Sequence, residues 1–185
     1  DGPIIGIVTR FVGHKGIDLI RCVFDQMVQS GIRFAVLGSG ERIYEDFFRE
    51  MAARYPGKVS VTIGFVSELS HRIYAGADMF LMPSQSEPCG LAQMIAMRYG
   101  TVPIVRETGG LRDSVRDNGG VNGNGFTFKT YNADDMLDAV NRAVRDYNNK
   151  SEWISLVKRA MECDYSWASS ADLYIETYNE LVNAK

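Results

Sequence analysis

Short apolar runs alternate along the chain with longer segments in which apolar residues recur every three or four positions. Apolar runs without polar alternation are typical of strands buried on both faces of a parallel sheet, whereas the longer spacing indicates helices. The pattern predicts strands at 3–9, 34–38, 59–64, 78–83, 102–105 and 126–129. It predicts helices at 17–28, 43–55, 67–75, 91–99, 111–115, 133–147, 151–163 and from 166 to the end.

Strands that alternate with helices indicate an α/β fold, here a Rossmann-like parallel sheet flanked by helices. Ser67, Asn132 and Ser166 precede helical patterns and are expected to act as N-caps, because their side-chain oxygens accept hydrogen bonds from the first free N–H groups. The stretch DNGGVNGNG (117–125) predicts a flexible loop by its composition.

Two glycine-bearing turns join a predicted strand to a predicted helix: EPCGLAQ (87–93) and TGGLRD (108–113). The carboxyl ends of parallel strands meet at one edge of a sheet, and ligands bind there. A helix start leaves backbone N–H groups unpaired, and glycine lets a ligand approach the backbone closely. Two such turns facing one crevice would suit a diphosphate, although each turn alone is also typical of a tight connection.

Charged side chains follow the same strands. Arg10 and Lys15 lie in the loop after the first strand, where they either bind phosphate or remain solvated. Glu87 either stabilises the start of the following helix by its negative charge or accepts hydrogen bonds from a hydroxyl-rich ligand. Phe65 follows the third strand, where it either stacks on a base or belongs to the core. Cys89 has no nearby base in the sequence to activate it as a nucleophile.

Composition narrows the possible functions. The 185 residues suit one domain, and the net charge of -3 disfavours a nucleic-acid partner. No apolar run approaches the roughly 18–20 residues that span a bilayer, so no membrane partner is expected. Three widely spaced cysteines indicate a reducing, cytoplasmic setting, and neither histidine has metal-ligand spacing. Because an apolar strand begins almost at once, we expect a piece of a longer chain.

Five stretches occur in order: KGIDLI, LGSGE, IGF, the block SHRIYAGADMFLMPSQSEPCGLAQMIAMRYGTVPIVRETGGLRDSV and DYSW. Together they resemble the C-terminal, nucleotide-sugar-binding domain of bacterial glycogen synthases and plant starch synthases. The resemblance implies a GT-B fold, with the active site between two Rossmann-like domains. It implies transfer of glucose from ADP-glucose to the non-reducing end of an α-1,4-glucan with retention. It also implies that no metal or other cofactor is needed, which agrees with the lack of a D-x-D triplet.

The resemblance also implies roles for particular residues. Arg10 and Lys15 match the pair that binds the diphosphate, and Glu87 matches the carboxylate that contacts the donor glucose. These three are the expected catalytic residues. The expected contacts to nucleotide and sugar are Gly38, Ser39, Phe65, Cys89, Gly90, Leu91, Thr108, Gly109, Gly110 and Leu111.

Two positions depart from related patterns. Many GT-B transferases carry a second Glu where this chain has Ile95, and its absence supports the narrower assignment to glycogen synthases while leaving recognition of the ribose open. Many members have Thr where this chain has Ala92, which removes one possible hydroxyl contact.

The resemblance predicts two parts, a Rossmann-like domain at 1–165 and a helix at 166–185 that crosses back toward an N-terminal domain absent from the chain. The glucan would bind through that domain, so this chain alone is expected to bind ADP and ADP-glucose but to be inactive. A plant protein would lie in the plastid. Two alternatives remain: a non-catalytic nucleotide-sugar-binding module, or another GT-B transferase that uses UDP-glucose.

Overall fold

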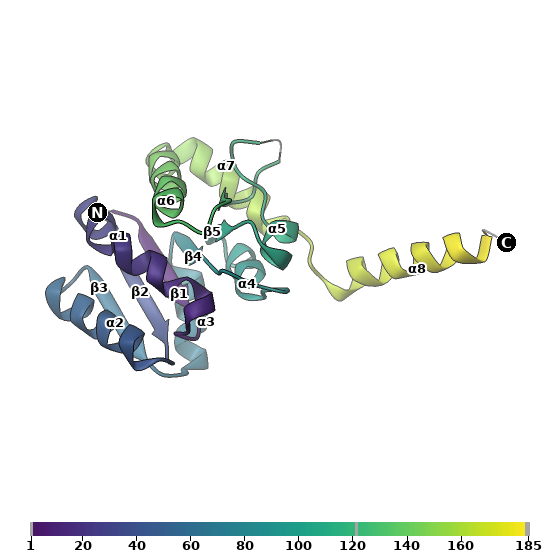
Figure 1. Cartoon of the computed structure of the whole chain (residues 1–185). Coiled ribbons are helices and arrows are strands. Elements are labelled where there is room, and N and C mark those ends of the chain that lie inside the picture. Colours follow the sequence, from purple (N-terminus) through teal and green to yellow (C-terminus); the bar gives the residue numbers. More distant parts are fainter. Residues whose placement is uncertain (1, 121, 184–185) are drawn as a thin grey trace.

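A computed structural model of the chain describes residues 2–120 and 122–183 (Figure 1). The predicted segments 1–165, 117–125 and 166–185 therefore include residues that lie outside the described ones. All six predicted strands are present, with bounds that differ by at most one residue at either end. They are β1 (Ile4–Val8), β2 (Arg33–Gly38), β3 (Val59–Ile63), β4 (Met79–Met82), β5 (Val102–Arg106) and β6 (Phe126–Phe128).

The strands form one parallel sheet in the order β3-β2-β1-β4-β5-β6, which confirms the Rossmann-like prediction. β1 pairs with β2 on one side and with β4 on the other, for example at Ile5↔Met79. The chain therefore builds the sheet outward from β1 to β3 and then returns to the centre. The switch point, where ligands bind in such sheets, lies between the carboxyl ends of β1 and β4.

The predicted helices are also present. They are α1 (Ile17–Gln29), α2 (Arg42–Arg54), α3 (Ser67–Gly76), α4 (Ala92–Arg98), α5 (Gly109–Ser114), α6 (Ala133–Asn148), α7 (Lys150–Met161) and α8 (Trp167–Asn183). A short 3₁₀ helix, η1 (Gly13–Lys15), was not predicted. Helices cover both faces of the sheet, as the apolar strands require.

The core divides between the two faces. Alternate residues such as Ile5 and Ile7 of β1 join the larger cluster, to which α1, α2 and α6 contribute. Two smaller clusters lie on the other face. Phe80 of β4 packs there with residues of α3 and α4, and Val105 of β5 packs with residues of α4 and α5. The sheet is thus fixed from both sides, and its carboxyl edge provides a rigid base for the loops.

The predicted caps had different outcomes. The side chain of Asn132 accepts hydrogen bonds from two N–H groups of α6, at 2.7 and 3.3 Å, and Ser166 Oγ accepts one from Ser169 N–H at 3.3 Å. Both predictions are confirmed. The prediction for Ser67 is wrong, because Val66 is the N-cap of α3 and has no capping side chain. Ser67 is already inside the first turn.

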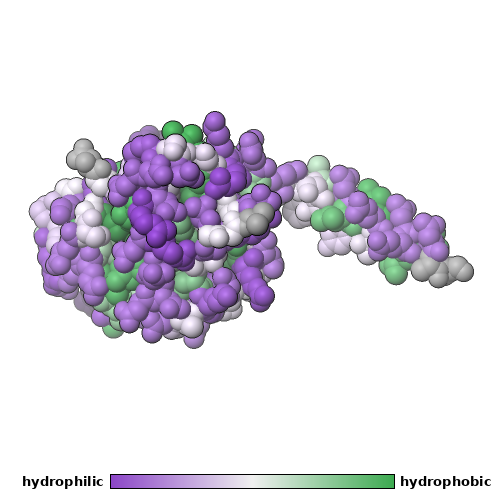
Figure 2. Space-filling view, turned by 90° about the horizontal axis from the view of Figure 1, so that it is seen from above, coloured by the Kyte–Doolittle hydropathy of each residue, from purple (hydrophilic) through white to green (hydrophobic). Residues whose placement is uncertain are grey.

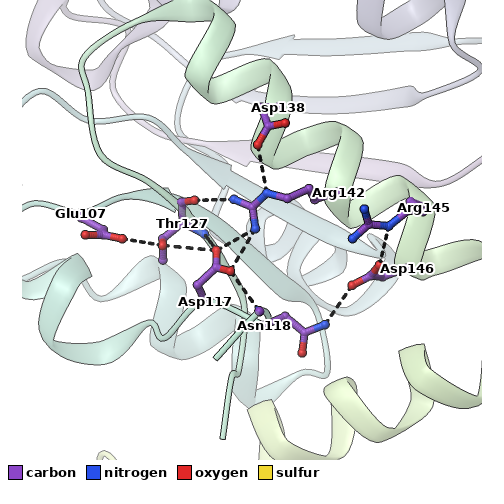
Figure 3. Close-up of polar contacts among 9 residues, drawn as sticks. Glu107, Asp117, Asn118, Thr127, Asp138, Arg142, Arg145 and Asp146 are labelled. Carbon is purple, nitrogen blue, oxygen red and sulfur yellow. Dashed lines mark hydrogen bonds and ion pairs between the residues drawn. The ribbon is translucent and has the colours of Figure 1, made fainter. Parts of the chain in front are cut away.

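The loop 117–125 is anchored where composition predicted flexibility (Figure 3). The guanidinium of Arg142 donates to both oxygens of Asp117, at 3.0 and 2.9 Å, and the N–H groups of Thr127 and Gly119 also donate to this carboxylate. Burial alone would raise the pKa of Asp117, but these hydrogen bonds outweigh it and lower the pKa overall. An ion pair therefore fastens the start of the loop to α6.

The end of this loop is buried. Asn124 is inaccessible to solvent, and its amide donates to the carbonyl of Ser114 at 3.0 Å. Arg159 of α7 donates to the carbonyl of Gly123 and to Asn118 Oδ1, both at 2.8 Å. The prediction of a flexible loop is thus wrong at both ends of the segment, because partners distant in sequence satisfy its polar groups.

α8 projects from the body of the molecule (Figure 1) and has no buried residue over 167–183. Hydrophobic side chains lie among hydrophilic ones along it (Figure 2). The largely exposed ones are Trp167, Leu173, Tyr174, Ile175, Tyr178, Leu181 and Val182. Within the described residues, no helix is both long and apolar enough to traverse a bilayer.

Candidate functional site

The loops that follow β1 and β4 lie against each other at the switch point. The N–H of Gln85 donates to the carbonyl of His14 at 2.9 Å. Gly16 has a φ of 77°, and a Cβ at this position would lie 2.1 Å from the carbonyl oxygen of Pro83. A side chain at position 16 would therefore force the two loops apart.

This contact brings Lys15 and Glu87 together. Lys15 Nζ donates to Glu87 Oε2 at 2.5 Å, and their side chains are only 16% and 11% exposed. Ser84 Oγ donates to the same carboxylate oxygen at 3.3 Å. The sequence suggested a cation and a carboxylate on one rim, and the structure places them in a largely buried ion pair.

The two glycine-bearing turns are in direct contact. The N–H of Gly110 donates to the carbonyls of Glu87 and Pro88, at 3.1 and 3.3 Å. A Cβ on Gly110 would lie 1.9 Å from the carbonyl oxygen of Cys89, and one on Gly109 would lie 2.1 Å from that of Glu87. These glycines are therefore required for the turns to interlock, a role that the sequence analysis did not foresee.

The first turn carries unpaired backbone donors. The N–H groups of Cys89, Gly90 and Leu91 have no hydrogen-bond acceptor in the described part of the chain. The side chains of Cys89 and Leu91 are exposed, and Gly90 has a φ of 75° that favours glycine. Three adjacent free donors beside Glu87 can bind an anion or the oxygen atoms of a sugar.

The second turn offers fewer donors than the first. The N–H of Gly110 is engaged by the first turn, and the N–H of Leu111 donates to the carbonyl of Thr108 at 3.1 Å. Leu111 is fully buried in the core, whereas Thr108 is only partly buried. Of the three N–H groups at positions 109–111, only that of Gly109 lacks an acceptor among the described residues. The second turn thus supports the first more than it presents donors.

A cavity of about 240 Å³ opens at the same edge of the sheet, at the ends of β1, β2 and β3. Arg10, Gly38, Ser39, Phe65 and Tyr74 are among the residues that line it. The side chain of Phe65 is 92% exposed, so the alternative of a core residue is wrong. Burial raises the pKa of the Tyr74 hydroxyl above its ordinary value, because the charged form is poorly solvated there.

Gly38 allows the end of β2 to pack closely against the residues that follow β1. A Cβ at this position would lie 2.0 Å from the carbonyl oxygen of Thr9 and 2.6 Å from the ring of Phe11. Ser39, one residue further, is exposed. A single cavity thus unites the loop after β1 with the loop after β2.

Sequence reasoning missed Arg106, at the end of β5. Its Nε donates to the carbonyl of Ser84 at 2.9 Å, and its Nη2 donates to that of Gln85 at 2.5 Å. These bonds brace the loop that carries Glu87. The rule that selected Arg10, a cation at the carboxyl end of a parallel strand, also applies to Arg106.

The sequence of the chain is similar to those of known proteins. The family described as "Glycosyl transferases group 1" matches residues 1–159. A glycogen synthase from Geobacillus thermodenitrificans is 53% identical over 184 residues, which are 98% of this chain and 38% of that protein. The chain thus spans about two fifths of the length of this relative.

Solved structures share the fold. The catalytic domain of starch synthase IV from Arabidopsis thaliana, bound to ADP and acarbose, superimposes with a TM-score of 0.88 at 39% identity. The match covers 98% of this chain and 39% of that one. Sucrose-phosphate synthase from Thermosynechococcus elongatus, at 22% identity, covers 100% of this chain and 47% of that one with a TM-score of 0.71, which indicates a common fold alone.

Proposed function

The chain belongs to the family of group 1 glycosyl transferases, and from this premise we propose that it binds the nucleotide-sugar donor of a glycogen or starch synthase. The proposed reaction transfers glucose from ADP-glucose to the non-reducing end of an α-1,4-glucan, with retention of configuration. Identity to a glycogen synthase supports the substrate class, and the related starch synthase structure that holds ADP supports the nucleotide.

The observation that carries the proposal is the Lys15–Glu87 ion pair beside three N–H groups that have no acceptor among the described residues. Cations and N–H groups suit a diphosphate, whereas a carboxylate suits neutral hydroxyl groups. In this proposal, Arg10 and Lys15 bind the diphosphate and Glu87 faces the glucose. Phe65 stacks on the base, and the turn at 89–91 contacts both the sugar and the phosphates.

During the proposed reaction, the bond between the anomeric carbon and the diphosphate oxygen breaks. A hydroxyl oxygen of the glucan bonds to that carbon from the same face, and its proton passes to the departing phosphate. Arg10, Lys15 and the free N–H groups offset the negative charge that develops on ADP. Glu87 stabilises positive charge at the anomeric carbon. The glucan would bind a preceding domain, so the chain alone should not elongate it.

Calorimetric titration of ADP, ADP-glucose and UDP into the chain tests the proposal. ADP should bind more tightly than UDP, and Arg10→Ala should weaken ADP binding about tenfold, because a charge-assisted contact to phosphate is lost. Arg145→Ala is the matched control, since this arginine lies on α6 and its side chain is 73% exposed. Tighter binding of UDP would favour a transferase that uses UDP-glucose. No binding of any nucleotide would contradict the proposal.

Elongation of glycogen by this chain alone, followed with radiolabelled ADP-glucose, would contradict the expectation that the isolated chain is inactive. If nucleotides bind but the relatives' preceding domain restores no transfer, the function is that of a binding module.

A further inference from the structure

Gln93 lies in the first turn of α4 and is inaccessible to solvent. Its side chain folds back beneath the turn that carries the free donors. Gln93 Nε2 donates to the carbonyl of Gly90 at 2.8 Å and lies 3.4 Å from that of Cys89. A Cβ on Gly90 would lie 2.6 Å from Gln93 Oε1, so the amide fits closely under the backbone.

Ser114 continues this set of contacts. It is the last residue of α5 and is buried. Its hydroxyl accepts a hydrogen bond from Gln93 Nε2 at 3.0 Å and donates to the carbonyl of Gly110 at 2.6 Å. Two buried side chains therefore connect the Gly90 carbonyl to the Gly110 carbonyl. We call this pair, Gln93 and Ser114, the amide–hydroxyl relay.

The relay determines where the free donors point. A trans peptide is planar, with its C=O and N–H on opposite sides. When Gln93 holds the carbonyl of Gly90 from below, the N–H of Leu91 in the same peptide must point to the other side. The contact with the Cys89 carbonyl directs the N–H of Gly90 likewise. The carbonyls thus face the protein interior while the donors remain available.

The relay leaves one polar atom without a partner. Gln93 Oε1 is buried and has no donor in the described part of the chain. Buried polar atoms are nearly always paired, and an exception calls for an explanation. An apolar side chain of similar length would avoid the penalty but would supply no donor for the Gly90 carbonyl.

We propose that Gln93 and Ser114 are positioning residues, which hold the 89–91 turn so that its N–H groups bind the β-phosphate and the adjoining sugar. This inference rests on the proposed function, because it assigns the ligand of the free donors. Neither residue touches the ligand. Both act through the orientation of the peptides.

Calorimetry with ADP and AMP tests the relay, because only ADP has a β-phosphate. The variants are Gln93→Met, which keeps the side-chain length but loses the donors, Ser114→Ala, and the double variant. We expect each single change to weaken ADP binding about tenfold while AMP affinity stays within about twofold. The double variant should lose little more than either single variant, because the two side chains form one relay.

Thr101→Val is the matched control. The hydroxyl of Thr101 is also buried and bonds the carbonyls of Tyr74 and Ala77, the latter at 2.9 Å, near the amino end of β5. Its loss removes comparable bonds at the far edge of the sheet. This variant should keep the unaltered ratio of AMP to ADP dissociation constants, even if thermal unfolding shows lower stability.

The outcomes separate the two proposals. If the unaltered chain binds ADP more tightly than AMP and the relay variants keep that ratio, the relay is overturned and the proposed function stands. Unfolding of both single variants at the assay temperature, with Thr101→Val folded, would assign Gln93 and Ser114 a purely structural role and overturn the relay. Equal affinity of the unaltered chain for ADP and AMP also overturns it. Absence of any nucleotide binding overturns both proposals.

Discussion

Replacing Lys15 by methionine should destabilise the fold, because Glu87 would remain as an unpaired charge with little access to water. The paired atoms are 2.5 Å apart, and the two side chains are 16% and 11% exposed. With an effective dielectric constant of about 20, unit charges at this distance attract by about 6.6 kcal/mol. Desolvation offsets part of this attraction, and removal of one partner from a buried pair costs about 3–5 kcal/mol. We expect a loss of about 3 kcal/mol.

Glu87→Gln should cost less, about 1–2 kcal/mol, because the amide oxygen can still accept a hydrogen bond from Lys15. The double variant leaves no unpaired charge. It should therefore be more stable than Lys15→Met alone, which gives a coupling energy of about 2–3 kcal/mol. Urea unfolding at pH 7, followed by circular dichroism for all four proteins, measures this energy.

An exposed pair provides the control for this cycle. Arg72 and Glu68 on α3 also lie 2.5 Å apart, but their side chains are 74% and 77% exposed. Their coupling should stay below about 0.5 kcal/mol, because water screens exposed charges. Additive effects of the Lys15 and Glu87 substitutions, within about 0.5 kcal/mol, would refute the reasoning that burial makes this pair strong.

Phe65→Ala should weaken ADP binding by calorimetry about tenfold through lost stacking, yet leave the melting temperature within about 2 °C, because the ring is 92% exposed. The folded pKa of Asp117 lies below its ordinary value, so its contribution to stability is present above that ordinary value and is lost as the pH falls through the folded pKa. Urea unfolding of Asp117→Asn should therefore show lower stability at pH 7 and a smaller loss between pH 5 and pH 2, roughly, than the unaltered chain. In this chain alone, α8 should exchange its amide protons within seconds by mass spectrometry, because its residues are not buried. Slow exchange of α8 would show that it is covered in solution.

The elements of the fold were predictable because burial imposes a period on the sequence. The central strands β1, β4 and β5 are mostly apolar, and in the predicted helices apolar residues recur every three or four positions. Ser67 shows the limit of local signals, because a serine one residue inside a helix looks the same as a cap. The loop 117–125 shows another, since its anchors Arg142 and Arg159 lie far along the chain.

The sequence predicts which turns form the site, but it does not predict which residues those turns contact. A glycine after a strand indicates close approach of the backbone, yet the sequence does not say what approaches. Gly110 meets the carbonyl of Cys89, a neighbour about twenty positions away, and its N–H is already engaged. The sequence places Gln93 in a predicted helix and indicates nothing more, because its role depends on the geometry of two turns.

The Lys15–Glu87 pair gives this edge of the sheet a local dipole, with positive charge on the β1 side and negative charge on the β4 side. In the proposed reaction, the bond between glucose and diphosphate breaks with negative charge growing on ADP and positive charge growing on the sugar. A fixed ammonium at one end of that bond and a fixed carboxylate at the other would stabilise both charges as they separate. Because the interlocked turns and the bonds from Arg106 hold this arrangement before a donor binds, little reorganisation would be needed when the charges develop.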